Sequence, residues 1–186
     1  MSKRIVVLFS GEGTNLQRLM ETLPSHGIEI ACAITNRPDA PGIEKARRFG
    51  VPVEVIDHTA FATREAFDAA LVETIGKYHP DLTVAAGFMR ILTPVFTEQV
   101  KAINIHPSLL PKYKGANAIA QSYASGDKVC GVTVHWLNGE LDGGEVIEQA
   151  SFECREGMDA EAFETEVHAL EYKLLPETVI RLLCES

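Results

Sequence analysis

The chain has 186 residues, of which 46% are hydrophobic and 23% are charged. This length and composition predict a single globular domain, 1–186, whose core needs neither disulfides nor a structural metal. The formal net charge of -9 argues against nucleic acid as the principal partner, because phosphate backbones are bound by clustered Lys and Arg.

The cysteines and the apolar segments limit the cellular setting. The sequence contains no C-x-x-C pair and no metal-ligand spacing among Cys32, Cys130, Cys154 and Cys184. It has no signal-peptide run at its N-terminus, and no apolar stretch reaches the roughly 18 residues that a membrane span needs. We therefore expect a cytoplasmic protein with no metal and no membrane partner.

The first elements are a strand, a glycine-rich turn and a helix. Residues 4–9 (RIVVLF) form a nearly continuous apolar run, typical of a strand buried on both faces of a parallel sheet. The turn 10–15 (SGEGTN) follows, and leucines at helical spacing begin at Leu16. Such a turn directs backbone N–H groups and the positive end of a helix dipole at a bound anion, usually a phosphate. A purely structural turn is the alternative.

The same turn matches only part of the dinucleotide-binding fingerprint G-x-G-x-x-G. Gly11 and Gly13 begin the fingerprint, but Leu16 stands where its third glycine belongs. The acidic residue expected after the second strand, 28–35, is replaced by Asn36-Arg37-Pro38. The pattern therefore favours a monophosphate over NAD.

Strands and helices continue to alternate through the middle of the chain. We predict helices over 42–50 and 64–78 and a short helix from Pro94, with strands over 52–56, 81–86 and 103–106. Thr63 is expected to cap the second of these helices. The alternation predicts an α/β fold with a Rossmann-like, mostly parallel sheet and helices on both faces.

The second half of the chain changes character. Strands are predicted over 131–137 and 145–152, and the connection between them is too short for a helical crossover. We therefore expect an antiparallel addition to the sheet. A long closing helix is predicted over 159–183, and Pro176 is expected to bend or split it.

The strongest chemical signal lies at the end of the strand 103–106. There the apolar residues alternate with Asn104 and His106, so the strand delivers an amide and an imidazole to its carboxyl end, where α/β sheets bind ligands. Pro107 ends the strand and is expected to leave the His106 ring aimed outward. Asp142, before Gly143-Gly144, supplies a carboxylate in a later loop.

These three groups suit the transfer of an acyl-type group to an amine. Asn104 can donate a hydrogen bond to a carbonyl oxygen that gains negative charge. His106 can transfer a proton near neutral pH, and Asp142 would orient the protonated ring. No G-x-S-x-G elbow surrounds Ser108, so direct transfer is the simpler reading. Each residue also has a structural alternative as a loop cap or turn former, and His135, inside a strand, is interpreted as structural.

Four segments of the sequence resemble the folate-dependent formyltransferases. They are 104–111 (NIHPSLLP), 141–144 (LDGG), 10–17 (SGEGTNLQ) and 87–92 (GFMRIL), and together they match the glycinamide ribonucleotide formyltransferase family. The resemblance covers nearly the whole chain. It implies the formyltransferase fold, with an N-terminal phosphate-binding half of about 1–100 and a C-terminal folate and catalytic half of about 101–186.

The resemblance also implies the reaction and its partners. The formyl group of 10-formyltetrahydrofolate would pass to the amine of glycinamide ribonucleotide through a tetrahedral intermediate, in purine biosynthesis. Both partners are small molecules, no metal takes part, and the enzyme would be a monomer or homodimer.

Site residues follow from the resemblance by position. The catalytic set is Asn104, His106 and Asp142. The ribonucleotide set is Gly13, Thr14, Asn15, Leu16, Gln17, His168, Ala169, Leu170 and Glu171. The folate set is Arg64, Met89, Arg90, Ile91, Leu92, Asn104, Asn138, Gly139, Glu140, Leu141 and Asp142.

The sequence departs from the family in one segment. Ala116-Asn117-Ala118-Ile119 stands where many members have His-containing residues, and it resembles the matching stretch of methionyl-tRNA formyltransferase. That enzyme has an additional nucleic-acid-binding domain, which is not expected here, and the end at Ser186 is early for the family. The remaining alternatives are formyltetrahydrofolate hydrolase, another folate-dependent formyltransferase and, more remotely, a nucleotide-binding module without chemistry.

Overall fold

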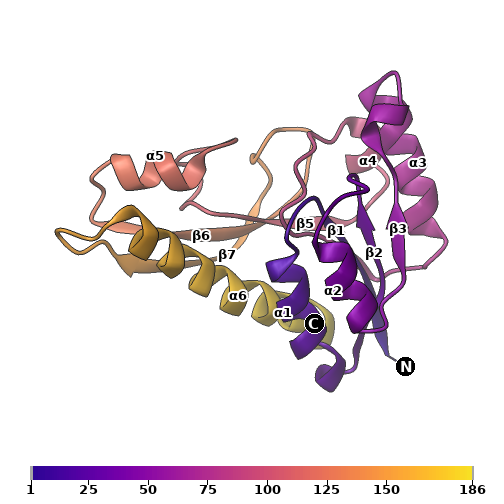
Figure 1. The fold of residues 1–186 in the computed structure, drawn as a ribbon, viewed down its shortest axis with the longest axis horizontal. Helices are drawn as coiled ribbons and strands as arrows, with labels where there is room; N and C mark the ends of the chain where they lie inside the picture. The colour runs from indigo at the N-terminus through magenta and orange to yellow at the C-terminus, as the bar shows by residue number, and fades with distance from the viewer. Residues whose placement is uncertain (1, 186) are drawn as a thin grey trace.

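The computed structural model describes residues 2–185, and its centre is a twisted sheet (Figure 1). Within these residues the sheet has seven strands in the order β3-β2-β1-β4-β5-β6-β7. The strands are β1 (Lys3–Phe9), β2 (Ile28–Thr35), β3 (Val53–Val55), β4 (Leu82–Ala85), β5 (Ala102–His106), β6 (Val129–Trp136) and β7 (Val146–Glu153). The first five pair in parallel, and β6 and β7 add antiparallel to β5. This arrangement confirms the predicted fold class.

Helices cover both faces of the sheet. One face carries α1 (Thr14–Thr22), α2 (Gly42–Arg48) and α6 (Ala160–Cys184), and the other carries α3 (Arg64–Gly76) and α4 (Pro94–Thr97). The helix α5 (Ala118–Ala124) lies near the far end of β6, and short 3₁₀ turns span Pro24–His26 and His58–Ala60.

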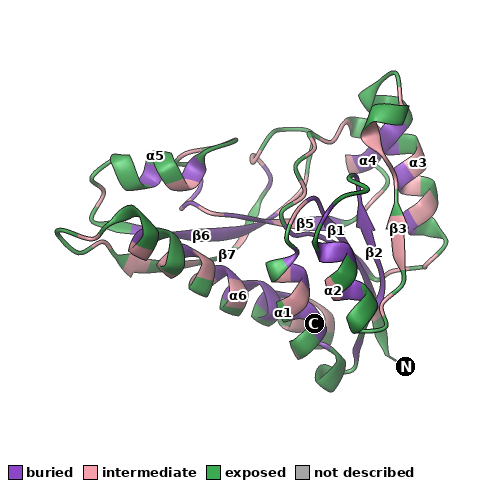
Figure 2. Ribbon diagram, viewed as in Figure 1, coloured by how far each residue is buried: buried purple, intermediate pink, exposed green. Residues whose placement is uncertain are grey.

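The apolar run of β1 is explained by a core on each side of the sheet. Ile5, Val7 and Phe9 enter the cluster beneath α1 and α6, whereas Val6 and Leu8 enter the cluster beneath α3. Successive side chains of a strand point to opposite faces, so a central strand must be apolar throughout. Figure 2 shows these buried residues concentrated along the strands and on the inner sides of the helices.

Two features differ from the sequence-based expectations. The helix α5 was not predicted; it has only seven residues, and its N-cap, Asn117, makes no side-chain capping bond. Helix α6 runs without interruption through Pro176, so the proline does not split it, and the bend stays a prediction. Pro176 is buried among apolar neighbours such as Leu175 and Val179, and this packing offsets the hydrogen bond that proline cannot donate.

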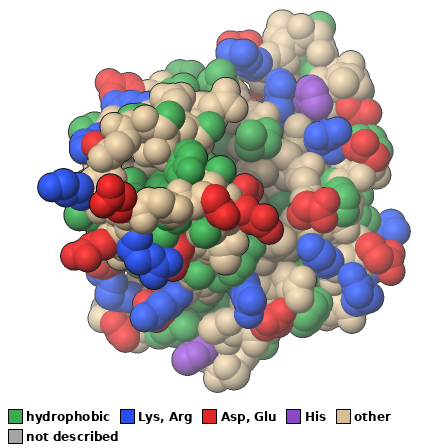
Figure 3. Space-filling view, turned by 60° about the vertical axis from the view of Figure 1, so that its left-hand side comes forward, with side chains coloured by type: hydrophobic (Ala, Val, Ile, Leu, Met, Phe, Trp, Pro, Cys, Tyr) green, Lys and Arg blue, Asp and Glu red, His purple; other side chains and the backbone are tan. Residues whose placement is uncertain are grey.

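Among the helices of residues 2–185, none combines the length and the apolar composition of a membrane-spanning segment. On the face that Figure 3 presents, basic side chains alternate with acidic ones.

Candidate active site

The carboxyl ends of the central strands are tied together by Ser10, the residue after β1. Its amide donates to the Gly87 carbonyl at 3.0 Å, and its hydroxyl donates to Asn36 Oδ1 at 2.6 Å. The same hydroxyl accepts from the amide of Met89 at 2.8 Å. Ser10 therefore fixes the loops after β1, β2 and β4 relative to one another at the edge where the site forms.

The glycine-rich turn between β1 and α1 is held by α2. Gly13 has a φ of +70°, which favours glycine, and a Cβ there would lie 2.9 Å from the Gly42 Cα. The Gly42 amide donates to the Gly11 carbonyl, and Lys45 Nζ donates to the Glu12 carbonyl at 2.7 Å. Since no side chain caps α1, its first-turn amides are available to an anion.

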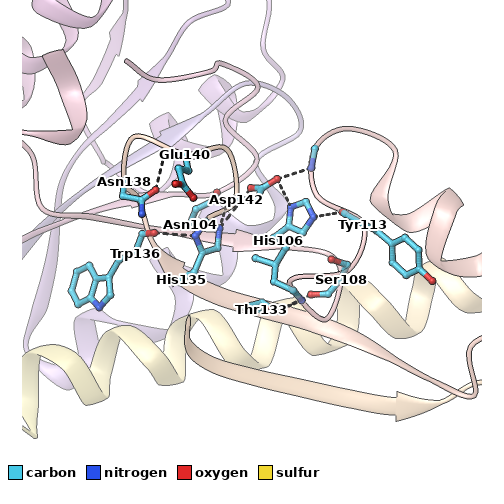
Figure 4. A network of polar contacts seen from close by, with 12 residues as sticks. Asn104, His106, Ser108, Tyr113, Thr133, His135, Trp136, Asn138, Glu140 and Asp142 are labelled. Atoms are coloured by element: carbon cyan, nitrogen blue, oxygen red, sulfur yellow. Dashed lines mark hydrogen bonds and ion pairs between the residues drawn. The ribbon is translucent and has the colours of Figure 1, made fainter. Parts of the chain in front are cut away.

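The three predicted catalytic groups form one cluster (Figure 4). Asn104 and His106 end β5, and Asp142 approaches from the β6–β7 loop with its carboxylate 3.5 Å from His106 Nδ1. His106 Nε2 donates to the Tyr113 carbonyl at 2.8 Å, because a carbonyl can only accept. The amide of Gly115 donates to Asp142 Oδ2 at 2.7 Å.

The expectation that the His106 ring points outward is wrong. The residue is 5% exposed, because the loop after Pro107 folds back over the ring and places the Tyr113 carbonyl against it. The imidazole is therefore held on both sides, by a carboxylate and by a backbone carbonyl.

His135 joins the cluster, although the sequence analysis assigned it a structural role. It lies directly opposite Asn104 in the β5–β6 pairing, and its Nε2 is 3.2 Å from Asn104 Nδ2 and 3.8 Å from Asp142 Oδ1. Its Nδ1 donates to the Trp136 carbonyl at 3.0 Å, so Nε2 accepts from the Asn104 amide. Burial lowers the pKa of His135, which keeps the ring neutral and suited to accept. No sequence signal marked His135, because its place opposite Asn104 depends on the β5–β6 register, which only the structure supplies.

Two cavities meet at this cluster. The phosphate-loop cavity, of about 420 Å³, runs between the turn before α1, the segment 115–119 and α6. The Arg90 cavity, of about 110 Å³, runs between the β4–α4 loop and the β6–β7 loop. Asn104 and Phe88 line both cavities, so the Asn104 amide stands at their junction.

The predicted ribonucleotide residues divide between this cavity and other surroundings. Five of them line the phosphate-loop cavity: Gly13, Thr14, Asn15, His168 and Glu171. The Leu16 side chain lies in the core, Gln17 donates to Glu21, Ala169 is exposed, and Leu170 faces a separate groove beside β7. The Asn15 Oδ1 atom is buried without a hydrogen-bond partner.

Most of the predicted folate residues line the Arg90 cavity. These are Arg90, Ile91, Leu92, Asn104, Asn138, Gly139, Glu140, Leu141 and Asp142. Met89 instead lines the phosphate-loop cavity, and Arg64 lies at the exposed start of α3, in the lining of neither cavity. The β4–α4 loop is held against α3, because the buried Asp68 accepts hydrogen bonds from both the amide and the hydroxyl of Thr93.

One end of the phosphate-loop cavity carries a charged pair on α6. His168 Nδ1 lies 2.6 Å from Glu171 Oε1, and its Nε2 lies 3.3 Å from Glu164 Oε1. The hydrogen bond to Glu171 raises the pKa of His168. The pair therefore presents a carboxylate and an imidazole to the cavity, groups that can bind an amine and neighbouring polar atoms.

A larger cavity, of about 810 Å³, lies elsewhere, between α5 and the outer ends of β6 and β7. Its lining includes Tyr123, Lys128, Cys154 and Phe163. Within residues 2–185 no group of three His, Cys, Asp or Glu side chains is arranged to hold a metal ion.

Known proteins resemble the chain in both sequence and structure. The family model described as formyl transferase matches residues 3–179. The phosphoribosylglycinamide formyltransferase of Escherichia coli strain K12 is 40% identical over 176 residues, which cover 92% of this chain and 83% of that protein. The trifunctional purine biosynthetic protein adenosine-3 of Bos taurus is 38% identical, and the match covers 95% of this chain but 18% of that much longer protein.

A solved structure agrees with these relatives. The crystal structure of phosphoribosylglycinamide formyltransferase from Campylobacter jejuni superposes with a TM-score of 0.93 at 47% identity, covering 98% of each chain. The sequence match over most of the chain and the shared architecture lead to one conclusion: the chain belongs to the formyl transferase family.

Proposed function

We infer that the chain is a phosphoribosylglycinamide formyltransferase, which transfers the formyl group of 10-formyltetrahydrofolate to the amine of glycinamide ribonucleotide in purine biosynthesis. The observation that carries this inference is the junction of the two cavities at Asn104, beside the His106–Asp142 pair. A two-substrate transfer needs a donor and an acceptor to meet at one polar centre, and this arrangement supplies it. The family and the named relatives support the same reaction.

The phosphate-loop cavity suits the ribonucleotide. The uncapped amides of α1 would bind its single phosphate, while Glu171 and His168 at the other end would bind its glycinamide group. This distribution places the acceptor's amine toward Asn104.

The Arg90 cavity suits the folate. Its lining includes two large apolar residues that are exposed to solvent, Ile91 at 48% and Leu141 at 55%. Apolar surface beside backbone donors and acceptors is suited to a flat pterin ring. The folate acts here as a co-substrate, which arrives formylated and leaves as tetrahydrofolate.

The geometry supports the following chemical roles. The neutral amine attacks the formyl carbon, a C–N bond forms, and the carbonyl electron pair moves to oxygen, where the Asn104 amide and the His106 imidazolium stabilise it. Nε2 of His106 is occupied by the Tyr113 carbonyl, so Nδ1, 3.5 Å from Asp142, is the nitrogen that faces the reaction. Collapse then breaks the bond from carbon to folate nitrogen, and the amine's proton passes to that nitrogen with the help of Asp142 and His106.

Features of the cavities distinguish the alternatives. A hydrolase acting on the folate alone would not need the phosphate-loop cavity with its Glu171–His168 end. A nucleotide-binding module would not need Asn104, His106 and Asp142 at the junction.

We also propose that the enzyme works in the cytoplasm, because its four cysteines are free thiols. The net charge of -9 supports small-molecule partners and argues against nucleic acid. We propose that the enzyme is a monomer or homodimer.

A deformylation assay tests the proposal. The protein is mixed with 10-formyltetrahydrofolate, and folate absorbance is followed with and without glycinamide ribonucleotide. We expect absorbance to change only when the ribonucleotide is present. Loss of formyl groups without it would identify a hydrolase, whereas no reaction in either mixture would contradict the proposed transferase.

A further inference from the structure

The segment Pro107–Gly115, here called the covering loop, is hydrogen-bonded to both His106 and Asp142. Its Tyr113 carbonyl accepts from His106 Nε2, and its Gly115 amide donates to Asp142. The proton arrangement of His106 therefore depends on where one short loop places two backbone groups. Neither group belongs to a side chain, so their positions are set by whatever holds the loop.

Tyr113 has a backbone conformation that needs support. Its φ of +55° lies in the left-handed region, which costs a residue with a Cβ roughly 1 kcal/mol. Such a conformation persists only where the surroundings fix it. This conformation aims the Tyr113 carbonyl at the His106 ring.

The support comes from the turn before β6. The Tyr113 hydroxyl donates to Asp127 Oδ2 at 2.7 Å, and Lys112 Nζ approaches the same oxygen at 3.3 Å. The hydrogen bond from Tyr113, with a second from Lys112, lowers the pKa of Asp127, so the carboxylate is charged at neutral pH. Asp127 lines neither of the two substrate cavities.

We propose that the Tyr113–Asp127 hydrogen bond is an anchor that positions His106: it holds the Tyr113 carbonyl against Nε2–H, so that Nδ1 faces Asp142 and the reacting atoms. This proposal rests on the proposed function. Tyr113 and Asp127 are positioning residues, because they act on the imidazole through the covering loop. Without the anchor, Tyr113 relaxes toward a negative φ, its carbonyl turns away, and the ring loses the acceptor of its Nε2–H.

The test compares three substitutions with a matched control. Tyr113→Phe and Asp127→Ala each remove one side of the anchor, while Asp127→Asn keeps an acceptor oxygen. The control is Tyr123→Phe, which removes another phenol, one that donates to the Met158 carbonyl away from both cavities. Turnover, KM for each substrate and the melting temperature are measured for every variant.

We expect kcat to fall about tenfold in Tyr113→Phe and in Asp127→Ala, since small displacements of a catalytic group reduce rates by up to about a hundredfold. KM for both substrates should stay within about twofold, because the cavities are untouched. The double variant should lose no more than either single one, Asp127→Asn should recover most of the loss, and Tyr123→Phe should behave as wild type.

A spectroscopic readout separates this proposal from the proposed function. Nitrogen-15 NMR of the unliganded protein reports whether Nε2 of His106 carries a proton and whether that proton is hydrogen-bonded. We expect a protonated, hydrogen-bonded Nε2 in the wild type and Tyr123→Phe, and loss of that hydrogen bond in Tyr113→Phe and Asp127→Ala. An unchanged Nε2–H signal would overturn the anchor even if kcat falls, and so would unchanged kcat or equal rises in both KM values. A wild type that lacks transferase activity would instead overturn the proposed function.

Discussion

The polar side chains of β5 depend on their neighbours for the roles proposed for them. His135, opposite Asn104, accepts one of its amide protons at 3.2 Å, and we propose that the other amide proton binds a substrate oxygen. His106 is buried, and both of its ring nitrogens have partners. At this scale the chemistry depends on pairs of residues more than on any single one.

The substitution His106→Ala tests the oxyanion role. We expect kcat to fall on the order of 10²-fold or more, the usual loss when one such donor is removed, while both KM values change little. Steady-state kinetics with each substrate varied measures the two effects separately. His26→Ala, at an exposed position outside both cavities, serves as the control. A rise in KM at normal kcat would contradict the role in the transition state.

The buried His135 should make stability depend on pH. Burial lowers its pKa in the folded state below the ordinary value of 6.5, so the unfolded chain takes up the proton first as the pH falls. Stability should therefore decline as the pH drops through about 6.5, until the folded protein also binds the proton. In His135→Gln that part of the decline should vanish. Urea denaturation from pH 7.5 to 5 measures it, and parallel curves for the two proteins would disprove the assignment.

At the scale of secondary structure, the sequence was informative wherever a pattern repeats. The strand β1 was predicted because its residues fill two cores, and Thr63 caps α3 as expected. The helix α5 was missed because seven residues carry too little periodicity to stand out, and its Asn117 makes no capping bond. The proline in α6 does not split the helix, because tertiary packing around Pro176 outweighs the local rule.

The site was predictable only in part, for a related reason. Strand ends and motif residues indicated Asn104, His106 and Asp142, and the structure brings them together. The contact between the Tyr113 carbonyl and His106 could not be predicted from the residue types, because a backbone group makes it. Distances across loops depend on the whole fold, so the junction of two cavities at Asn104 could not be derived from spacing alone.

Two glycines of the β6–β7 loop differ in their surroundings. A Cβ at Gly144 would lie within 1.6 Å of the Trp136 carbonyl oxygen, whereas a Cβ at Gly139 would meet nothing within 4 Å. Gly144→Ala must therefore displace the backbone that carries Asp142. We expect it to lower the free energy of unfolding by about 1–3 kcal/mol, as overpacked sites do, and to reduce kcat.

Gly139→Ala is the matched control in the same loop. It should leave stability and kcat near their wild-type values, because the new methyl group has open space. Chemical denaturation and steady-state kinetics of both variants make the comparison. Equal effects of the two substitutions would show that the loop is sensitive to any added side chain, rather than to the close approach at Gly144.

At the scale of the whole molecule, both substrate cavities combine segments from both halves of the chain. The phosphate-loop cavity combines the turn before α1 with His168 and Glu171 of α6, and the Arg90 cavity combines the β4–α4 loop with residues 137–142. The proposed division into a phosphate-binding half and a catalytic half therefore describes only which half supplies the main residues for each function. Neither half encloses a cavity without the other.

The overall charge opposes the proposed substrates. With a net charge of -9, the protein repels both a phosphate and an acidic folate tail, so local cations matter. The lining of the phosphate-loop cavity includes Glu12 and Glu171 but no Lys or Arg among the described residues. Lys45 is held against the loop itself by its 2.7 Å bond to the Glu12 carbonyl, which places a positive charge next to the proposed phosphate position.

Lys45→Met should therefore weaken ribonucleotide binding without affecting the chemistry. Exposed charge pairs contribute about 0.2–1 kcal/mol, so we expect KM for the ribonucleotide to rise by up to about fivefold, with kcat and the KM for folate unchanged. The effect should shrink as salt is added, because exposed charges are screened. Lys101→Met is the control, since its ammonium lies over the Trp136 ring and Lys101 lines neither cavity. If Lys45→Met leaves KM unchanged at low salt, the backbone amides of α1 hold the phosphate unaided and the charge at position 45 supports only the loop.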